Sequence, residues 1–389
     1  MRVGIFHNAY TWRGGEDAVV ALESDLLRKA EVEVSQFCVD NRDADLDSLA
    51  GRLRTGLRAR RSHAVGRRVD AFLAAHPLDV AHVHNFFPLL TPIVHERLHA
   101  HGVPVVQTLH NYRLYCANGA FLRDGRPCQD CVAAGPWNAV RYGCYRGSRV
   151  QTAVWAEATA HHRRRGTFER CVTLFVAPSG FARSLLVAAG LDPAKIVVKP
   201  NPVADPGAPR FGGRGAIYVG RLSPEKGPRL LLEAWREMDG LALDVIGSGP
   251  QEAELRRLAA EIPGVRMLGQ LPPSVVQERL REALFLVAPS LCYEIFSLAV
   301  AEAMAAGKAA VAAHPTAPAE LVEPGRTGLH FPMGDARALT RACRELAADP
   351  ARAEAMGREA RARYQDELAP ERSAHDLLAL YERAIRSGR

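Results

Sequence analysis

The stretch that decides the fold is ALFLVAPSLCYEIFSLAVAEAMAAGKAAVAAH, residues 283–314. It opens with an apolar run, ALFLVAPS, which is typical of a strand buried on both faces. After a short turn, LAVAEAMAAG has the composition of a helix that ends at Gly307. A second apolar run, KAAVAAH, follows directly. Two buried strands separated by a helix predict a parallel sheet that is covered on both faces.

The same alternation of apolar runs and helical patterns continues along the whole chain. The runs in the first half are RVGIF, VEVSQFCVD, DVAHVH, PVVQTLH, TLFVAPS and KIVVKPN, and those that precede the opening stretch in the second half are GAIYVG, LALDVIG and VRMLGQL. Between the halves, residues 200–215 (PNPVADPGAPRFGGRG) have the composition of a linker. With 389 residues, the chain is long enough for two domains.

We therefore predict an α/β protein with two doubly wound, Rossmann-like domains that face each other across a cleft. Residues 1–200 form the first domain and residues 206–368 the second. The apolar spacing of SAHDLLALYERAIRSG predicts a last helix, at about 370–389, that packs back on the first domain. Ligands of doubly wound sheets bind beyond the carboxyl ends of the strands, so we expect the site in the cleft.

The composition is that of a soluble globular protein, with 48% hydrophobic and 24% charged residues. No apolar run approaches the roughly 18 residues that a membrane-spanning helix needs. The first residues turn polar at His7, so we expect no signal peptide and a cytoplasmic location. The eight cysteines are then expected to be reduced unless a metal holds some of them.

The net charge of +7 is concentrated in the first half of the chain. Residues 1–200 hold 26 Lys and Arg against 18 Asp and Glu, with basic runs at 52–68 and 161–165. These runs can be ordinary solvated helix faces. They can also attract anionic lipid headgroups or phosphorylated acceptors, which would place the protein peripherally on the inner face of a membrane. We do not expect nucleic acid as a partner, because no aromatic residues interleave with the arginines.

Two carboxylates flank the start of the helix in the opening stretch. Ser297 is a candidate N-cap, and a helix N-terminus favours an anion such as phosphate. Glu294 lies in the preceding turn and Glu302 just over one turn into the helix, so both can grip hydroxyl groups beside that anion. The alternative is that Glu294 is an ordinary turn residue and Glu302 an ordinary surface residue.

A second loop supplies cations. YVGRLSPEKG follows the first strand of the second domain and offers Arg221 and Lys226, which together can clamp a diphosphate opposite the helix N-terminus. The alternative is ordinary loop solvation. The glycine turn VIGSGP, which contains Gly247, is weak evidence, since it lacks the third glycine and the acidic partner of a dinucleotide site.

These motifs, in this order, resemble the C-terminal half of glycosyltransferase family 4, whose members are retaining, nucleotide-sugar-dependent enzymes of GT-B fold. The matching stretches are YVGRLSPEKG, VIGSGP, VRMLGQLP, EIFSLAVAEAMAAGK and PAELVEPGRTGLHFPMGD. GIFHNAYTWRGGEDAVV, VAHVHNFFPL and QTLHNYRLYCANGAFLRDGRPCQDC in the first half resemble bacterial members that build capsular and exopolysaccharides. The resemblance covers nearly the whole chain.

The resemblance implies a donor site in the second domain. Arg221 and Lys226 match the pair that binds the donor diphosphate. Glu294 matches the glutamate that holds the donor sugar hydroxyls, and Glu302 the one that holds the ribose hydroxyls. The backbone amides that assist the first glutamate, and the glycine of the neighbouring turn, belong to Ile295, Phe296, Ser297, Leu298 and Gly247.

The resemblance also implies site residues in the first domain. Gly14 and Gly15 match a flexible glycine loop, where the lack of a Cβ lets backbone approach the diphosphate and the acceptor. His110 matches a histidine that contacts the sugar and the acceptor. His84 ends a neighbouring strand, and a structural role suits it equally. Two departures from the family pattern stand out: Ser297 replaces a frequent glycine, and PTAPAE replaces a glycine pair before Glu320.

The implied reaction is a same-face transfer with retention, in which the leaving diphosphate takes the proton of the acceptor hydroxyl. His110, Arg221, Lys226 and Glu294 are its predicted catalytic residues. No metal cofactor is expected for catalysis, because two cations and a helix N-terminus neutralise the diphosphate. The Asp43-Ala44-Asp45 sequence fits a solvated loop. The predicted co-substrate is a nucleoside-diphosphate sugar, and the acceptor is a sugar, a lipid-linked sugar or a small natural product.

Four cysteines cluster in one segment of the first half. Cys128 and Cys131 have the tight spacing of a tetrahedral thiolate site, while Cys116 and Cys144 stand at irregular distances. They form a candidate structural zinc site or, alternatively, are free buried thiols. The remaining cysteines stand singly in strand or helix patterns and are expected in the core: Cys38, Cys171, Cys292 and Cys343.

Three other functions were weighed against glycosyl transfer. A catalytically silent scaffold of the same fold predicts the loss of at least one of the four charged donor-site residues, and all four are present. A nucleotide-sugar epimerase needs catalytic carboxylates of its own and no acceptor segment like residues 110–149. A zinc-dependent nucleic-acid-binding module leaves the diphosphate clamp unexplained.

Overall fold

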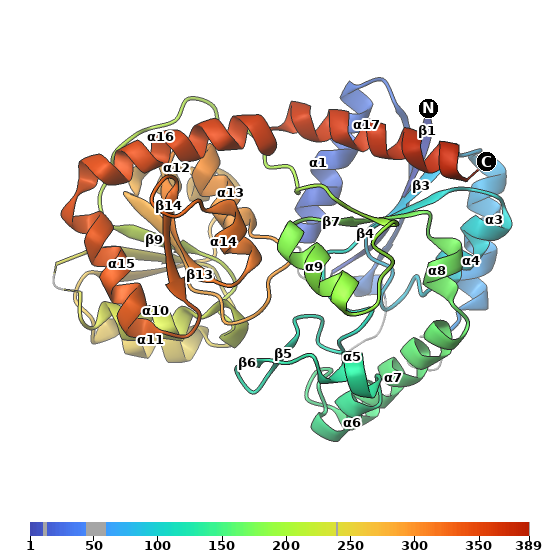
Figure 1. Cartoon of the computed structure of the whole chain (residues 1–389), viewed down its shortest axis with the longest axis horizontal. Coiled ribbons are helices and arrows are strands. Elements are labelled where there is room, and N and C mark those ends of the chain that lie inside the picture. The colour runs from blue at the N-terminus through green and yellow to red at the C-terminus, as the bar shows by residue number, and fades with distance from the viewer. Residues whose placement is uncertain (11–13, 44–59, 239, 389) are drawn as a thin grey trace. The chain divides into compact units, whose positions relative to one another are not determined.

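The computed structural model describes residues 1–10, 14–43, 60–238 and 240–388, and it divides into two compact units. The first unit comprises Met1–Phe121, Cys128–Pro202 and Glu371–Arg389, and the second comprises Leu122–Pro127 and Val203–Pro370. Each unit contains a six-stranded parallel sheet with helices around it (Figure 1). The predicted pair of doubly wound α/β domains is confirmed.

The sheet of the first unit has the strand order β2–β1–β3–β4–β7–β8. Its strands are β1 (Arg2–Ala9), β2 (Glu33–Asp40), β3 (Val80–Val83), β4 (Val105–Thr108), β7 (Leu174–Ala177) and β8 (Ile196–Val198). Every residue of β3, β4 and β7 is buried, as expected for central strands covered on both faces. Since β2 and β3 pair with β1 on opposite sides, the strand order reverses between β1 and β3.

Helices connect these strands and cover the sheet (Figure 1). They are α1 (Gly15–Lys29), α3 (His63–Ala75), α4 (Ile93–Ala100), α8 (Thr167–Cys171) and α9 (Gly180–Ala188), with the short turn η1 (Asn41–Asp43) after β2. The last helix, α17 (Pro370–Ser387), also belongs here. Its buried residues Leu377, Tyr381 and Ala384 pack in one cluster with core residues of β1, β3, β4 and β7, because they recur at helical spacing on one face.

The segment between β4 and β7 contains structure that the periodicity of the sequence did not predict. It holds the two-stranded antiparallel ribbon β5 (Leu122–Arg123) and β6 (Arg126–Pro127). Three helices follow: α5 (Asp130–Ala134), α6 (Asn138–Tyr142) and α7 (Arg149–Arg164). Trp155 of α7 is buried in a small cluster with Ala117, Ala139 and Ala156, which gives the segment a core of its own.

The sheet of the second unit has the strand order β11–β10–β9–β12–β13–β14. Its strands are β9 (Ala216–Val219), β10 (Leu243–Ile246), β11 (Val265–Gly269), β12 (Phe285–Ala288), β13 (Ala309–His314) and β14 (Gly328–Pro332). Its helices are α10 (Pro228–Trp235), α11 (Glu252–Ala260), α12 (Pro273–Glu282), α13 (Leu298–Ala305), α14 (Ala317–Leu321), α15 (Ala336–Ala348) and α16 (Pro350–Glu367), with the turn η2 (Pro224–Lys226) before α10. The order reverses between β9 and β12, which is where ligands of doubly wound sheets bind.

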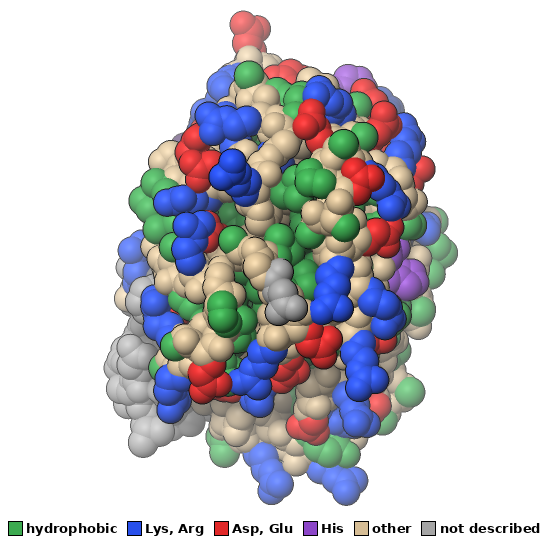
Figure 2. Space-filling model, turned by 90° about the vertical axis from the view of Figure 1, so that its left-hand side faces the viewer, with side chains coloured by type: hydrophobic (Ala, Val, Ile, Leu, Met, Phe, Trp, Pro, Cys, Tyr) green, Lys and Arg blue, Asp and Glu red, His purple; other side chains and the backbone are tan. Residues whose placement is uncertain are grey.

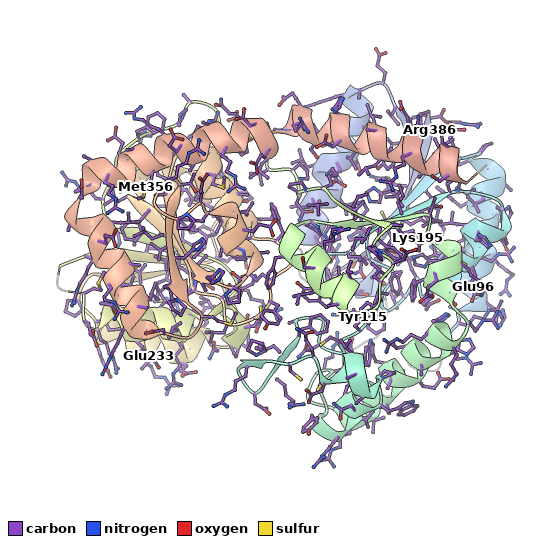
Figure 3. The ribbon with its side chains drawn as sticks, in the orientation of Figure 1. Glu96, Tyr115, Lys195, Glu233, Met356 and Arg386 are labelled. Atoms are coloured by element: carbon purple, nitrogen blue, oxygen red, sulfur yellow. The ribbon has the colours of Figure 1, made fainter. Side chains whose placement is uncertain are left out.

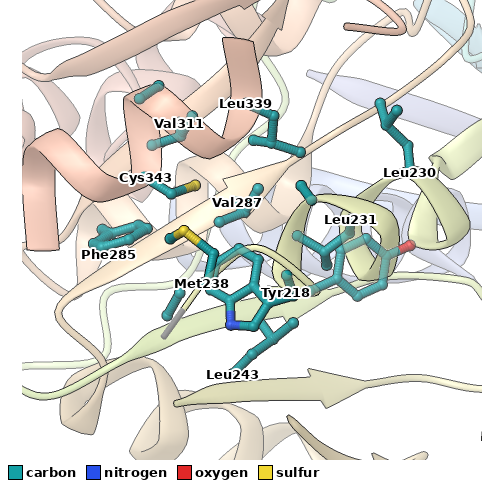
Figure 4. Packing of buried hydrophobic residues seen from close by; sticks show 14 of the residues in the cluster. Tyr218, Leu230, Leu231, Met238, Leu243, Phe285, Val287, Val311, Leu339 and Cys343 are labelled. Carbon is teal, nitrogen blue, oxygen red and sulfur yellow. The ribbon is translucent and has the colours of Figure 1, made fainter. Parts of the chain in front are cut away.

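A large apolar core fixes these elements of the second unit (Figure 4). Leu231 of α10, Phe285 of β12 and Leu339 of α15 are fully buried within it. Trp235 lies in the same cluster, and its indole N–H donates a hydrogen bond of 2.9 Å to the carbonyl of Leu241. Met356 of α16 also lies in this cluster (Figure 3). Such packing holds the strand ends, and the loops that leave them, in fixed positions.

Outside these cores, one prediction about burial is wrong. Cys38 is exposed, because β2 is an edge strand whose alternate residues Phe37 and Val39 point inward while Cys38 points out. Cys171, Cys292 and Cys343 are buried as expected.

On the face of the second unit shown in Figure 2, basic and acidic side chains are interspersed. No helix in the described part of the chain is long and apolar enough to cross a membrane.

Candidate functional site

The candidate site of the second unit lies where the strand order reverses. Lys226 ends the η2 turn after β9, and Glu294 lies in the loop after β12, so neighbouring parallel strands deliver them to the same edge of the sheet. The Lys226 Nζ and the Glu294 Oε2 are 2.7 Å apart. Burial opposes the charged form of Lys226, yet the Glu294 carboxylate outweighs it and raises the pKa of the lysine. The two predicted site residues therefore form an ion pair.

Each oxygen of Glu294 has one protein partner. Ser290 donates a hydrogen bond from its hydroxyl to Oε1, and Lys226 contacts Oε2. A carboxylate offers about four acceptor positions, so about two remain for hydroxyl groups of a ligand. Ser290 was missed in the sequence, because a serine at the end of a strand carries no signal of its own.

Arg221 is an exposed cation on the same loop. No described residue forms a hydrogen bond or an ion pair with its guanidinium group. Its backbone is fixed, however, since the buried Tyr218 donates a hydrogen bond of 2.9 Å to the Arg221 carbonyl. Burial and the nearby charges of Glu294 and Glu225 raise the pKa of Tyr218, so it stays a donor. The protein thus positions Arg221 and leaves its charge available.

The helix α13 begins at the site. Ser297 is its N-cap and accepts a hydrogen bond of 3.4 Å from the Val300 N–H. Glu294 and Ile295 are buried in the turn that precedes the cap, while Phe296 and Leu298 are partly exposed. The serine therefore takes one of the free donors of the first turn and leaves others for an anion.

Glu302 lies one turn further along α13. No described residue forms a hydrogen bond or an ion pair with its carboxyl group. Burial alone raises its pKa to about 7. A carboxyl group without a protein partner is suited to pair with a ligand hydroxyl.

Glycines allow the loops of the site to pack closely. Gly227 has a positive φ of 68°, and a Cβ there would lie 2.0 Å from the Pro289 carbonyl oxygen. Gly247 has a φ of 140°, and its Cβ would lie 1.9 Å from the Gly220 carbonyl oxygen. Both need to be glycine for the fold itself. The fold therefore explains Gly247 without a ligand.

In the first unit, Gly14 and Gly15 lie between β1 and the first turn of α1. Gly14 is the N-cap, and its N–H donates a hydrogen bond of 2.9 Å to the Asp17 carboxylate, which also lies 3.0 Å from the His7 ring. A Cβ on Gly14 would meet no atom of the described residues beyond its chain neighbours within 4 Å. Unlike Gly227 and Gly247, Gly14 is therefore not required by contacts within the protein. Residues 11–13 of this loop lie outside the described residues.

His110 follows β4 and contacts His84, which follows β3. His110 Nε2 and His84 Nδ1 are 3.0 Å apart, and the two rings are stacked. Burial and the neighbouring histidines lower the pKa of His110 to about 3 and that of His84 well below its usual value. Both imidazoles are therefore neutral at physiological pH. The structure joins the two histidines that the sequence could only name separately.

Behind His84 lies a buried set of residues that sequence reasoning missed. Glu23 of α1 is 2.7 Å from the Lys199 amine and 3.6 Å from His84 Nε2. His82 of β3 packs against the His84 ring, and its nitrogens lie 2.8 Å from the Tyr381 hydroxyl and 2.7 Å from the Thr108 hydroxyl. No local signal in the sequence marks these residues, because they lie far apart along the chain, from α1 to α17.

Glu23, His82 and His84 place one ligand atom each within 4.8 Å of the others, a spacing that a metal ion could use. Their other contacts oppose this. Both nitrogens of His82 already face hydroxyl groups, and the Lys199 amine beside Glu23 would repel a cation. The group is better described as a hydrogen-bonded cluster.

The four cysteines of the candidate zinc site are neighbours in the segment around α5 and α6. Burial and the other three thiols raise the pKa of Cys131 to about 11. Cys116 is buried, and its sulfur lies 2.9 Å from the Asn118 side-chain oxygen. In the described part of the chain, however, no three of the sulfurs of Cys116, Cys128, Cys131 and Cys144 lie within 4.8 Å of one another. The donor set suits zinc, but its spacing is wider than that of a closed thiolate site.

The basic runs are partly neutralised where the structure describes them. Glu96 of α4 lies 3.4 Å from Arg61 and 4.0 Å from Arg165 (Figure 3). Arg60 lies 3.3 Å from Glu157. His162 belongs to the basic run 161–165, but its ring is buried and forms hydrogen bonds within the protein. It is therefore not part of a solvated helix face. Residues 52–59 of the first run, and Ala44 and Asp45 of the Asp43-Ala44-Asp45 sequence, lie outside the described residues.

Two family descriptions match this chain. Residues 14–202 match the glycosyl transferase 4-like domain, and residues 213–349 match the glycosyl transferases group 1. The two matches cover both units in the expected order. The chain therefore belongs to the family 4 glycosyltransferases.

Among curated proteins, the chain is similar to a phosphatidyl-myo-inositol mannosyltransferase of Mycobacterium leprae, with 30% identity over 47% of this chain and 50% of the relative. It is 28% identical to an alpha-maltose-1-phosphate synthase of Mycolicibacterium smegmatis, over 64% of this chain and 70% of the relative. The alignment thus spans about half the length of the mannosyltransferase.

Solved structures show the same fold over the whole chain. Sucrose-phosphate synthase of Thermosynechococcus elongatus aligns with a TM-score of 0.72 and 20% identity, covering 99% of both chains. Anabaena HepE in complex with UDP aligns with a TM-score of 0.68 and 16% identity, covering 98% of this chain and 100% of the other. The chain therefore has the GT-B fold.

Proposed function

We propose that this protein is a retaining glycosyltransferase that moves a sugar from a nucleoside-diphosphate sugar to an acceptor hydroxyl in polysaccharide or glycoconjugate biosynthesis. The observation that carries the proposal is the charge arrangement at the β9–β12 reversal. Lys226 is paired with Glu294 at 2.7 Å, while Arg221 has no described partner. A catalytically silent scaffold would not require an exposed arginine whose backbone is fixed and whose charge has no described partner.

Each group has a task in the proposed donor site. Arg221, Lys226 and the N-terminus of α13 bind the diphosphate and stabilise the charge that develops on it as the glycosidic bond breaks. Glu294 accepts hydrogen bonds from the sugar hydroxyls through its remaining acceptor positions. Glu302 accepts them from the ribose, which favours its ionised form.

The proposed reaction needs no resident metal. The departing diphosphate oxygen takes the proton of the acceptor hydroxyl on the same face from which the sugar is attacked, so the configuration is retained. The space beside Gly14, where a Cβ would meet no protein atom, suits close approach of a ligand to the backbone. Catalysis then rests on positioning and charge stabilisation.

For the acceptor, we propose a lipid-linked sugar at an anionic membrane surface. Within residues 137–150 the side chains of Trp137, Tyr142 and Val150 are exposed apolar groups. Exposed arginines lie between them, and the segment 131–156 contains no Asp or Glu. Interfacial aromatics with arginines are typical of a surface that contacts anionic headgroups. A soluble natural-product acceptor is the alternative.

Calorimetric titration tests the donor site. Wild type and Arg221→Ala are titrated with a panel of nucleoside diphosphates and their sugars, starting with UDP, in buffer with a chelator. We expect one nucleotide to bind and Arg221→Ala to weaken it about 10- to 100-fold, since a charge-assisted hydrogen bond contributes about 1.5–3 kcal/mol. Arg229→Ala is the matched control, because Arg229 is exposed on α10 and pairs with Glu233. Folded protein that binds no member of the panel would refute the proposal.

Co-sedimentation with vesicles tests the membrane surface separately. We expect binding to vesicles that contain phosphatidylglycerol at low salt, weaker binding at high salt, and loss of binding in the double variant Trp137→Ala, Tyr142→Ala. Wild-type protein that stays in the supernatant at low salt would leave the soluble acceptor in its place.

A further inference from the structure

The buried cluster behind His110 contains two polar atoms that face only each other. His84 Nε2 and Glu23 Oε2 are both buried, and neither has a hydrogen-bond partner among the other described residues. They lie 3.6 Å apart. A water bonded to both atoms at about 2.8 Å would hold them about 4.5 Å apart, because its two hydrogen bonds meet at about 110°, so none fits between them. A shift of about half an ångström closes a direct hydrogen bond, which is the one way in which both atoms are satisfied.

The protonation states of this pair determine the direction of the bond. The Lys199 amine donates a hydrogen bond of 2.7 Å to the other oxygen of Glu23, and the two groups form a buried ion pair. An ionised carboxylate only accepts hydrogen bonds, so His84 Nε2 must carry the proton. His84 is neutral and has a single proton, which leaves its Nδ1 bare.

The same logic continues to His110. A bare His84 Nδ1 accepts a hydrogen bond, so His110 Nε2, 3.0 Å away, must donate it. His110 is also neutral, and its one proton is then used. Its Nδ1 is therefore an unprotonated acceptor, and no described residue bonds to it.

We propose that Glu23 and His84 are positioning residues that fix the tautomer of His110, so that it presents an acceptor nitrogen to a substrate hydroxyl. This inference rests on the proposed function for what His110 contacts. The other charged or titratable groups around the cluster are His7, His82, Asp17 and Lys199, and His82 is held by Tyr381 and Thr108 outside the relay.

The tautomers can be measured without any activity. Histidine labelled with ¹⁵N distinguishes protonated from bare ring nitrogens, and His84→Gln and His110→Gln assign the two signal sets. In wild type we expect both rings to carry the proton on Nε2. In Glu23→Gln we expect the opposite, because Lys199 attracts the amide oxygen and the amide NH₂ then faces His84 Nε2. His84 would take its proton on Nδ1 and donate to His110 Nε2, which moves the His110 proton to Nδ1.

The functional readout follows from that reversal. Glu23→Gln is expected to lower kcat about 10- to 100-fold, the usual effect of losing such a supporting partner. The KM for the donor should stay unchanged, because the donor diphosphate is proposed to bind in the second unit. Asp25→Asn is the matched control on the same helix, since Asp25 is exposed and pairs with Arg28. It should change neither tautomers nor kcat.

Three results would overturn the inference. Wild-type His110 protonated on Nδ1 would do so even if the Glu23 variant fails to fold. Unchanged tautomers in folded Glu23→Gln would do so too, as would a stoichiometric metal bound to Glu23 and His84. If no sugar is transferred and no nucleotide binds, the proposed function fails while the tautomer measurement still decides the relay.

Discussion

The lone carboxyl group of Glu302 gives a quantitative prediction. Burial raises its pKa from 4.5 to about 7 in the folded protein, and no described residue pairs with it. Between these two pH values the unfolded chain releases the proton and the folded chain keeps it. Stability therefore falls as pH rises through this window, by at most about 3 kcal/mol above pH 7. Glu302→Gln removes this pH dependence and should be more stable than wild type at pH 8 by up to that amount.

Urea denaturation at pH values from 4.5 to 8 measures the difference. We expect wild type and Glu302→Gln to be about equally stable near pH 4.5 and to diverge up to pH 7. Asp366→Asn, at an exposed position on α16, is the control and should run parallel to wild type. Equal stabilities of wild type and Glu302→Gln across the whole range would refute a raised pKa of the Glu302 carboxyl group.

Three further changes test neighbouring features of the chain. Lys226→Met leaves the buried Glu294 without its cation, so we expect a loss of about 3–5 kcal/mol in urea denaturation and a loss of nucleotide binding in calorimetry. Gly227→Ala introduces a Cβ about 2.0 Å from the Pro289 carbonyl oxygen at a positive φ, and thermal unfolding should show a destabilisation of at least about 1 kcal/mol. Purified with a thiol reductant, the protein should hold no stoichiometric zinc by elemental analysis, because the four sulfurs are spaced more widely than a closed thiolate site requires.

Each of these outcomes has a clear opposite. Nucleotide affinity that survives in folded Lys226→Met would show that the ion pair is structural only. Wild-type stability in Gly227→Ala would mean that the two loops do not pack as described. One zinc ion per chain in wild type, lost in Cys131→Ser, would show that the four cysteines close around a metal.

Much of the architecture could be predicted because parallel sheets leave a strong local signal. Every residue at 285–288 and 309–313 is buried, so these strands are apolar on both faces. Such a continuous apolar run can be recognised in the sequence without knowledge of distant contacts. Ser297 was predictable as an N-cap for the same reason, since capping involves only its own helix. The ribbon at 122–127 was missed, as a two-residue strand has no periodicity to detect.

The site was predictable only in part. Lys226 and Glu294 lie in loops that family motifs mark, so their contact could be expected from the sequence. The Glu23–Lys199 pair could not, because 176 positions separate its members and only the folded sheet brings them together. The sequence also does not show why a position is glycine. A Cβ at Gly247 would clash with the Gly220 carbonyl oxygen, whereas a Cβ at Gly14 would meet no described atom within 4 Å.

The membership of α17 in the first unit has a consequence for how the protein is made. Tyr381 and its helix complete the core around β1, β3 and β4, but the ribosome synthesises them after the whole second unit. At about 5–20 residues per second, roughly 170 intervening residues delay completion of that core by about 10–30 s. During this time the nascent first unit exposes apolar surface to chaperones. A nonsense mutation at residue 371 would leave the second unit complete and disrupt the unit that carries His110.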